Sequence, residues 1–454
     1  MSEVLSVPIR GTACLRQARV PAALLPAVVA GPDPAALVLV DIEFENGSIL
    51  SITPAGSRAP VCGDYSYDLD EGLVLPTLVD MHTHLDKGHI SPRQPNPDGT
   101  FMGALTAVGA DRTANWTAED VRARMEFSLR CAFAHGTSLI RTHLDSIPPQ
   151  ESISWPVFEE VRADWRERID LQAACLFGID RLDADDGFLT AIADRVASAR
   201  GVLGAVTYMI PRLDEHLDAM MVAASDRGLD LDFHADETGD CNARTLHHIA
   251  EAAIRHGFEG RIVVGHCCSL ARQQPDEIDR TLDLVAKAGL GIVSLPMCNM
   301  YLQDRQAGRT PRWRGVTLLH EMKARGIAVA VSSDNTRDPF YAYGDLDLVE
   351  VYTQATRILQ LDHPVGDWIR TVSTTPAELL GRPEQGRLRE GAPANLMLFR
   401  ARNWTELLAR PSGPRTVIRS GRSIDRTLPD YRELDAVLAA RPKALAKAMA
   451  GVAL

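Results

Sequence analysis

Apolar residues recur along the chain in short runs, and longer amphipathic segments separate them. Eight runs can be counted, and each has the length of one buried strand. They lie near residues 73–81, 137–142, 169–177, 201–208, 228–233, 261–265, 289–295 and 326–332. Strands that are apolar almost throughout are typical of a parallel sheet covered on both faces. The alternation of such strands with helical segments predicts an α/β fold.

Two of the intervening segments carry clear helix signals. Thr117-Ala118-Glu119-Asp120 resembles a capping box, with Asp in place of Glu, and is expected to open a helix that continues to Ala134. A second helix is predicted from Ala243 to Arg255, and Gly257 can end it. Eight strand–helix repeats favour closure of the sheet into a (β/α)8 TIM-like barrel.

Both ends of the chain have a different pattern, made of short β segments. Near the N-terminus, the runs 36–44 and 49–52 flank Glu45-Asn46-Gly47-Ser48, and Asn-Gly between two such runs predicts a hairpin. Near the C-terminus, β-like segments are expected at 386–391, 394–399 and 416–422. We interpret these segments as one small domain to which both chain ends contribute.

The domain boundaries follow from these two patterns. Residues 1–72 and 383–430 are predicted to form a discontinuous β-sheet domain, a small β-sandwich, and residues 73–382 the catalytic barrel. Residues 431–454 are alanine-rich and amphipathic from Tyr431 to Ala450, and we predict a helical tail there. A surface helix of this kind can form a subunit contact, so a homo-oligomer is expected.

Composition and charge narrow the class of partner. Hydrophobic residues make up 45% of the 454-residue chain and charged residues 24%, which is ordinary for a globular protein. The formal net charge of −12 disfavours general binding to nucleic acid or to an anionic membrane, so a small-molecule partner fits better. Residues 1–10 lack the features of a secretory leader, and we find no run of eighteen apolar residues. We therefore expect a cytoplasmic protein.

The cysteines do not suggest a disulfide framework or a thiolate zinc site. All eight are scattered through the chain without a Cys-x-x-Cys pair. Cys267 and Cys268 are adjacent, but we identify no base beside them that would activate a thiol. We expect both to pack near the end of a strand.

Residues that can bind a metal ion follow four of the predicted strands. Histidines one residue apart on an extended segment point the same way, and functional groups in such barrels gather at the carboxyl ends of strands. Three neutral imidazoles and a carboxylate leave a position open for water, as at catalytic zinc or ferrous iron sites. We therefore predict one divalent metal ion per chain, zinc or iron. The residues are His82 and His84 after the first strand, His234 and Glu237 after the fifth, His266 after the sixth and Asp334 after the eighth.

The same residues suggest a hydrolytic mechanism. A metal-bound water ionises near neutral pH and becomes a nucleophile. Glu237, three residues beyond His234, can reach over the site without binding the metal and can transfer the proton of that water. His266 could bind the metal, or it could hold and polarise the incoming oxygen. Each residue also has a structural interpretation, because a histidine can be a hydrogen-bonded core residue and Asp334 can cap a helix.

The motifs taken together resemble the amidohydrolase superfamily, and within it the cytosine deaminase group, over essentially the whole chain. This resemblance implies that His82, His84, His234 and Asp334 bind one metal and that Glu237 shuttles protons. It also implies that His266 orients the attacking hydroxide, so that Glu237, His266 and the ligand Asp334 form the catalytic set. The matching motifs are His82-Thr83-His84-Leu85-Asp86, Arg141-Thr142-His143-Leu144-Asp145, His234-Ala235-Asp236-Glu237, Gly265-His266, Asn299 through Leu302-Gln303, Asp334, Asp338-Pro339-Phe340-Tyr341 and Ala394-Asn395-Leu396.

The chain departs from that group where substrate is recognised. Relatives that deaminate cytosine carry a glutamine shortly after strand three, whereas this chain has Leu176-Phe177-Gly178-Ile179. Asn335 replaces an acid, Phe340 replaces a tryptophan that packs on the ring, and Lys87 follows the His-Leu-Asp motif. We predict that Lys87, Gly178, Asn335 and Phe340 contact a substrate other than cytosine. Lys87 could instead be a solvated loop charge.

Three functions are compatible with these features. The leading hypothesis is a metal-dependent hydrolytic deaminase of a cyclic amidine or amide-like nitrogen heterocycle, such as a pyrimidine, triazine or imidazolone, that releases ammonia or an amine. An alternative is a cyclic amide hydrolase of the same superfamily. Binuclear enzymes of that type commonly use a carboxylated lysine after strand four, and residues 205–209 contain none. A noncatalytic scaffold is the third, although the retained ligands argue against it.

Overall fold

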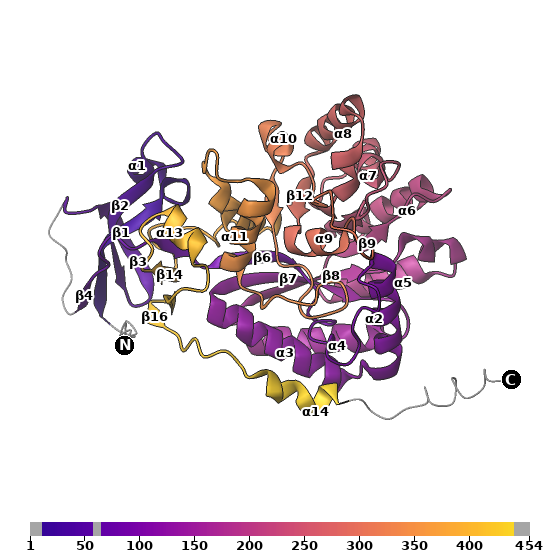
Figure 1. The fold of residues 1–454 in the computed structure, drawn as a ribbon, viewed down its shortest axis with the longest axis horizontal. Helices are drawn as coiled ribbons and strands as arrows, with labels where there is room; N and C mark the ends of the chain where they lie inside the picture. The colour runs from indigo at the N-terminus through magenta and orange to yellow at the C-terminus, as the bar shows by residue number, and fades with distance from the viewer. Residues whose placement is uncertain (1–10, 58–64, 440–454) are drawn as a thin grey trace.

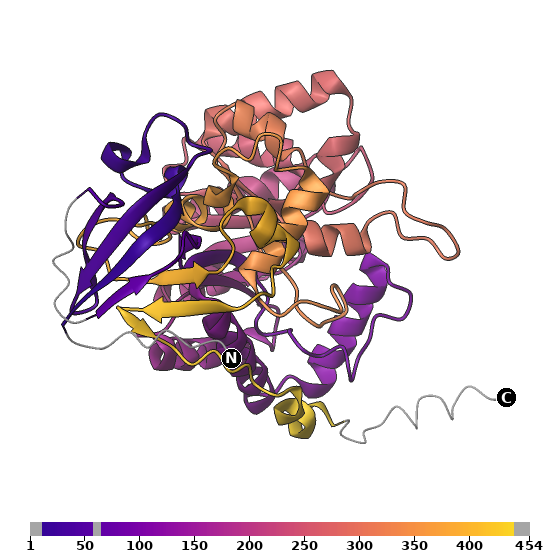
Figure 2. The same ribbon diagram turned by 60° about the vertical axis from the view of Figure 1, so that its left-hand side comes forward.

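The structure is a computed structural model that describes residues 11–57 and 65–439. A group of strands with few helices occupies one side of the molecule, and a larger region of strands wrapped by helices occupies the other (Figure 1). The turned view places strands from the two ends of the chain next to each other in the smaller region (Figure 2). The α/β class predicted from the sequence is confirmed.

The smaller region contains two four-stranded sheets. Buried side chains from both sheets, among them Leu15, Ile42, Leu396 and Ile418, form one hydrophobic cluster. The strand order is β3-β2-β1-β4 in one sheet and β16-β15-β14-β5 in the other. The bounds are β1 (Thr12–Pro21), β2 (Leu37–Glu45), β3 (Ser48–Pro54), β4 (Tyr65–Asp68), β5 (Val74–Pro76), β14 (Leu396–Phe399), β15 (Arg415–Arg419) and β16 (Arg422–Ser423).

The predicted N-terminal hairpin is confirmed. Strands β2 and β3 pair in antiparallel fashion around Asn46 and Gly47, which have φ angles of 49° and 89°. Positive φ at both central residues gives a turn whose twist matches that of the strands. A Cβ atom at Gly47 would lie 2.7 Å from the carbonyl oxygen of Ser420. Gly47 therefore permits the turn and also the close approach of the C-terminal hairpin.

Two details of the sequence prediction for this region are wrong. Residues 386–391 do not form a strand, because Gly386 and Gly391 have φ angles of 66° and 79° that interrupt extended backbone. The apolar run 73–81 is two strands rather than one. Its first part, β5, pairs with β14 in the smaller region, and only its second part continues as β6 (Leu78–Thr83) in the larger one.

The larger region contains a three-stranded and a five-stranded parallel sheet, in the orders β6-β7-β8 and β13-β12-β11-β10-β9. Isolated parallel bridges connect Ala174 with Val202 and Gly178 with Val206 at one pair of edges, and Thr83 with Asp334 at the other. Each of the seven other predicted runs overlaps one strand. These are β7 (Thr137–Asp145), β8 (Asp170–Leu176), β9 (Leu203–Thr207), β10 (Leu231–Ala235), β11 (Ile262–His266), β12 (Gly291–Ser294) and β13 (Val329–Val331).

Helices follow the strands and cover them (Figure 1). The predicted helix after Thr117 is confirmed as α3, whose first turn is capped by the Thr117 side chain accepting a hydrogen bond from the Asp120 backbone N–H. The helix that ends at Gly257, which has a φ angle of 55°, is confirmed as α7. The helices of this region are α2 (Phe101–Asn115), α3 (Ala118–His135), α4 (Glu151–Trp165), α5 (Phe188–Ser198), α6 (Leu213–Ser225), α7 (Thr245–His256), α8 (Pro275–Ala288), α9 (Pro296–Leu302), α10 (Leu319–Ala324), α11 (Leu348–Leu359) and α12 (Thr374–Leu379).

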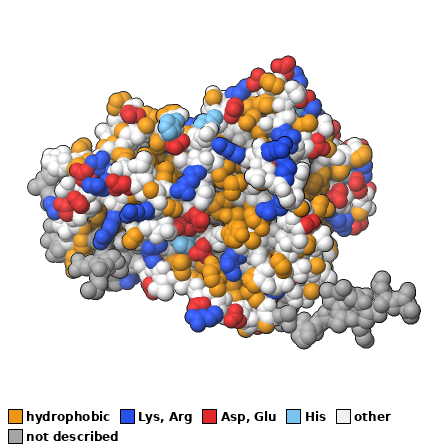
Figure 3. All heavy atoms as spheres, viewed as in Figure 1, with side chains coloured by type: hydrophobic (Ala, Val, Ile, Leu, Met, Phe, Trp, Pro, Cys, Tyr) orange, Lys and Arg blue, Asp and Glu red, His pale blue; other side chains and the backbone are white. Residues whose placement is uncertain are grey.

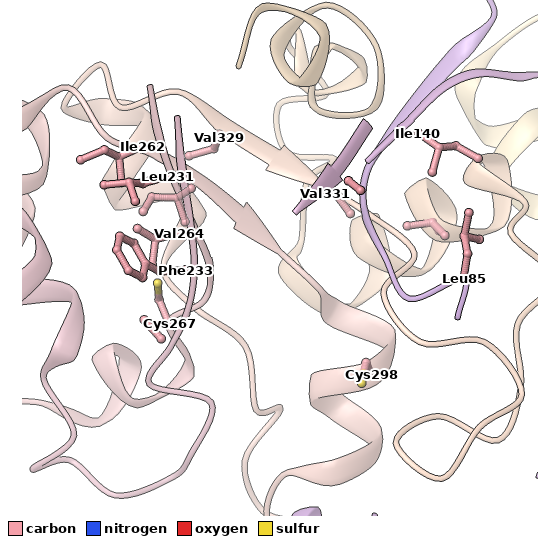
Figure 4. Packing of buried hydrophobic residues seen from close by; sticks show 14 of the residues in the cluster. Leu85, Ile140, Leu231, Phe233, Ile262, Val264, Cys267, Cys298, Val329 and Val331 are labelled. Carbon is pink, nitrogen blue, oxygen red and sulfur yellow. The ribbon is translucent and has the colours of Figure 1, made fainter. Parts of the chain in front are cut away.

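Apolar side chains of adjacent strands fill the space between sheet and helices. Phe233 of β10 is paired in register with Val264 of β11, and both lie close to Cys267 (Figure 4).

On the face shown in Figure 3, acidic and basic side chains are intermingled, and hydrophobic side chains gather near the centre. Among the described residues, no helix combines the length and apolar content needed to cross a membrane.

The chain end packs against the larger region as far as it is described. Tyr431–Leu434 forms a 3-10 helix that continues into α14 (Asp435–Leu438), and Leu434 packs with Phe127 and Cys131 of α3. The predicted helical tail extends to Ala450, and its part beyond residue 439 lies outside the described residues. α13 (Trp404–Ala409) lies between the last strands, and α1 (Ala27–Ala30) precedes β2.

Candidate metal and catalytic site

Three histidines and an aspartate meet where β6, β10 and β13 end. His84 Nε2 lies 3.2 Å from Asp334 Oδ1 and 3.4 Å from His234 Nε2, and His82 Nε2 lies 3.7 Å from Asp334 Oδ1. All four residues are buried. The structure thus brings together the four residues that the sequence analysis predicted as metal ligands.

The donor set fits a divalent metal ion. Zinc ligands at about 2.1 Å from the ion lie roughly 3.4 Å apart around a tetrahedron, which is the separation of these nitrogen and oxygen atoms. Both ring nitrogens of His82 and both carboxylate oxygens of Asp334 are buried without a hydrogen-bond partner in the described structure. Unpaired buried polar atoms are costly, and a cation between them would satisfy several at once.

The backbone at this site adopts conformations that are uncommon for residues with a side chain. Asp334 has a φ angle of 64° and His266 one of 70°. Such a conformation costs of order 1–3 kcal/mol and persists where the surrounding structure holds it. The Asp334 backbone N–H donates to the His82 carbonyl at 2.9 Å, and a Cβ atom at Gly265 would lie 2.9 Å from the His82 ring. Packing between strand ends therefore sets where each ligand points.

Glu237 and His266 form a second group beside the candidate ligands. Glu237 Oε1 lies 3.5 Å from His266 Nδ1, and Asn299 Nδ2 lies 2.9 Å from the same nitrogen and 3.3 Å from the same oxygen. An amide nitrogen can only donate, so His266 Nδ1 accepts and the ring proton resides on Nε2. His266 Nε2 is buried without a partner in the described structure, so it is a free donor.

Burial governs the protonation of these groups. It raises the pKa of Glu237 well above the usual range, and Asp334 adds to this effect, whereas Lys87 and the Asn299 hydrogen bond oppose it. Burial also lowers the pKa of His266 to about 3, so this imidazole is neutral near pH 7. A carboxyl group that can carry a proton and a neutral imidazole that donates one hydrogen bond suit acid–base chemistry.

His143 and Asn299 are two site residues to which the sequence analysis gave no role. His143, at the end of β7, has its ring centroid 4.0 Å from that of His82, and His143 Nε2 lies 3.0 Å from Asp232 Oδ1. Its Thr-His-Leu-Asp context repeats that of His84, which was the available signal. Asn299 lies on α9, and its position between Glu237 and His266 depends on tertiary packing.

A cavity of about 160 Å³ opens beside the candidate ligands. Phe101, Phe177, Tyr208 and Phe340 contribute aromatic walls, and His84, His234, Glu237 and His266 line the cavity as well. Flat aromatic walls next to a few polar groups are typical of a site for a planar small molecule. A ring in this cavity would lie next to the candidate ligands His84 and His234 and next to Glu237 and His266.

Lys87 lines this cavity, so its interpretation as a solvated loop charge is wrong. The side chain is 6% exposed, Nζ lies 3.0 Å from Asp145 Oδ1, and the Phe340 ring centroid is 5.5 Å away. Burial opposes the charge, but Asp145, Asp86 and Asp338 outweigh it and raise the pKa of Lys87. Lys87 therefore remains an ammonium ion at the cavity wall.

The other predicted substrate contacts also line the cavity. Gly178, Asn335 and Phe340 are part of its wall. Asn335 donates to Asp338 Oδ2 at 2.6 Å, which leaves its carbonyl oxygen as the free hydrogen-bonding atom toward a ligand. Cys298 Sγ lies 3.7 Å from that oxygen, a weak contact.

Strand β9 ends without a lysine, as read from the sequence. Thr207 occupies its last position, and its hydroxyl donates to the His234 carbonyl oxygen at 3.1 Å.

Cys267 and Cys268 are buried, and burial raises the pKa of both thiols well above the usual range. Both thiols are therefore protonated near neutral pH, which agrees with packing rather than nucleophilic roles.

Comparisons with known proteins find a matching family and similar relatives. The profile of the amidohydrolase family matches residues 173–425. The pterin deaminase of Rhizobium rhizogenes is 56% identical over 436 residues, which cover 96% of this chain and 99% of the relative.

Solved structures resemble the fold at lower identity. The 5-methylcytosine deaminase of Klebsiella pneumoniae, liganded with 5-fluorocytosine, has a TM-score of 0.79 at 23% identity and covers 92% of this chain and 98% of that one. The N-isopropylammelide isopropylaminohydrolase of Burkholderia multivorans has a TM-score of 0.74 at 22% identity, with 92% and 100% covered. At these identities the likeness concerns the fold.

Proposed function

The chain belongs to the amidohydrolase family and is a deaminase-type hydrolase of C–N bonds in nitrogen heterocycles, and we propose that its substrate is a pterin. In this reaction, water replaces the exocyclic amine of the 2-amino-4-oxopteridine ring. The C–N bond to the amine breaks, a C–O bond forms at the same carbon, and ammonia leaves. The observation that carries the proposal is the buried donor set that adjoins an aromatic cavity containing Glu237.

The proposed architecture follows the sequence prediction. We treat the strands from β6 to β13 as one closed (β/α)8 barrel, supported by the parallel bridges at both pairs of sheet edges. We treat the two four-stranded sheets as the discontinuous β-sandwich domain, with residues 431–454 as a separate tail. The predicted boundary at residue 73 is moved past β5, because β5 pairs within the smaller region.

The metal is proposed to bind to His82, His84, His234 and Asp334, with one ion per chain. A divalent zinc or iron ion there would supply a water molecule acidic enough to act as a nucleophile near neutral pH. His143 is proposed to support the site from behind, since Asp232 holds its Nε2 atom. Burial keeps the three ligand imidazoles neutral, because it lowers their pKa values well below the usual range.

The remaining steps belong to residues of the chain. Glu237 takes a proton from water at a carboxylate oxygen and passes it to the ring nitrogen next to the reacting carbon. It then takes the remaining proton from the hydroxyl group formed at that carbon and delivers it to the departing amine. His266 directs its Nε2–H into the site and holds the attacking oxygen, and Asn299 fixes the tautomer that makes this possible. The rings of Phe101 and Phe340, whose centroids lie 5.5 Å apart, limit access of bulk water.

The pterin assignment rests on one relative and on the cavity. The relative that is 56% identical across nearly the whole chain is a pterin deaminase. The wall at Gly178 lacks the glutamine side chain that reads a pyrimidine edge in cytosine deaminases. An unpaired buried carbonyl costs roughly 1–3 kcal/mol, so cytosine is expected to bind poorly there.

Ammonia release from a panel of heterocycles tests this assignment. We expect metal-loaded protein to release ammonia from pterin with a kcat/KM at least about tenfold above that for cytosine, which corresponds to ~1.4 kcal/mol of transition-state stabilisation. The same panel should include an N-alkylated aminotriazine. Cytosine or the triazine reacting faster than pterin would refute the pterin assignment and leave the deaminase class intact.

Lys87→Met is expected to lower kcat/KM for pterin by at least about tenfold. The methionine keeps the length of the side chain but removes the ammonium that can meet an electron-rich atom of the substrate. Asp145 retains Arg112 as a partner, so the fold should persist. Steady-state kinetics check this, with Lys323→Met on α10 as control, because Lys323 pairs with Asp367 on the surface. If the variant has the same kinetics as the parent, Lys87 does not contribute to substrate recognition.

A further inference from the structure

Helix α2 forms one wall of the cavity, and it ends in a cation. Phe101, Leu105, Val108 and Arg112 all line the cavity. Their spacing of three and four residues places them on one face of a helix. The first three are apolar, so Arg112 in the last turn is the only charged group that this face of the helix presents to the described cavity.

Arg112 and Lys87 share one buried carboxylate. Arg112 Nη1 lies 2.7 Å from Asp145 Oδ2, and Lys87 Nζ lies 3.0 Å from Asp145 Oδ1. Asp145 is itself anchored, because its backbone N–H donates to Asp86 Oδ2 at 2.8 Å. One carboxylate thus fixes two cations side by side at the cavity wall.

Both cations keep donors for a ligand. An arginine has five N–H donors in a rigid fork and a lysine has three, and neither group can accept a hydrogen bond. The Arg112 side chain is 21% exposed, so part of it is open to a ligand that enters the cavity. A pair of donor-only groups recognises an edge of a ring that carries only acceptors.

We propose that Arg112 and Lys87, held by Asp145, read the acceptor edge of the substrate, namely a ring carbonyl oxygen and an adjacent ring nitrogen. This inference rests on the proposed deaminase function and specifies its substrate class as aminoheterocycles with such an edge. Arg112 contacts the substrate, and Asp145 is a positioning residue. The aromatic walls stack on the ring faces and do not distinguish donors from acceptors. Arg112 and Lys87 therefore select for the hydrogen-bonding pattern at the edge of the ring.

A comparison of two substrates tests the inference. Pterin carries the ring carbonyl, and 2-aminopteridine has the same ring system and amine without it. We expect Arg112→Met to lower kcat/KM for pterin at least about tenfold and for 2-aminopteridine less than about threefold. Arg112→Lys should retain part of the selectivity, because it keeps the charge but loses the fork.

The control is Arg122→Met on α3, where Arg122 pairs at the surface with Glu126, Glu160 and Asp164. It should leave both substrates unchanged. Equal loss for both substrates in Arg112→Met, or no loss for either, would overturn the inference while the deaminase function stands. A separate titration of pterin into the Glu237→Gln variant measures binding without turnover. Failure of the parent to deaminate either compound, together with no binding in that titration, would overturn the proposed function and this inference with it.

Discussion

Replacing Glu237 by glutamine is expected to lower kcat for pterin ~100- to 10,000-fold, the usual contribution of general acid–base catalysis. Glutamine has nearly the same size and keeps a carbonyl oxygen for Asn299, which lies 3.3 Å from Glu237 Oε1. It cannot take up a proton from water and deliver it to the ring. Because Glu237 is not among the predicted metal ligands, metal content should stay at the parental level.

Single-turnover and steady-state kinetics, with elemental analysis of the same preparations, measure this effect. Glu251→Gln on α7 is a suitable control, since Glu251 lies on the surface and forms an ion pair with His247. A Glu237→Gln enzyme within a few-fold of the parent would exclude Glu237 from proton transfer. A loss of both metal and activity would instead make Glu237 a ligand.

Replacing His234 by alanine is expected to abolish metal retention and, with it, turnover. His234 Nε2 lies 3.4 Å from His84 Nε2, so its removal opens one side of the predicted four-ligand set. Catalytic metal sites depend on few protein ligands, and loss of one lowers affinity strongly. The parent should contain about one divalent ion per chain, because the two groups of candidate ligands among the described residues share His82 and therefore adjoin one position.

Elemental analysis after dialysis tests the ligand assignment, and His216→Ala is the matched control. His216 is also buried, but it lies outside the site, where its Nε2 atom is 2.8 Å from Asp183 Oδ1. The control should keep its metal. Undiminished metal in His234→Ala, or two equivalents of metal in the parent, would contradict the assignment of one ion to these ligands.

The strands of the larger region could be predicted because burial on both faces makes each one a continuous apolar run. The same signal could not show that the run 73–81 belongs to two sheets. Residues of β5 and β6 are all buried, and only the pairing of β5 with β14, more than three hundred residues later, separates them. Glycines with positive φ explain why 386–391 resembled a strand in composition but does not form one.

The candidate ligands could be predicted for a related reason. Each of His82, His84, His234 and Asp334 lies at or just after the end of an apolar run, so strand register alone brings them to the same end of the sheet. Asn299 and Arg112 could not be found in this way. They lie on α9 and α2, and their contacts with His266 and Asp145 depend on how those helices pack over the strand ends.

Isotopic analysis of the product formed in ¹⁸O-labelled water tests the central claim most directly. If the protein is a hydrolytic deaminase, metal-loaded enzyme and pterin should yield an intact ring that carries one labelled oxygen at the carbon that bore the amine. One ammonia should be released for each labelled oxygen, and the Glu237→Gln variant should form little product. A product that retains the amine and adds labelled water across an opened ring would contradict the account, because it would identify the protein as a cyclic amide hydrolase.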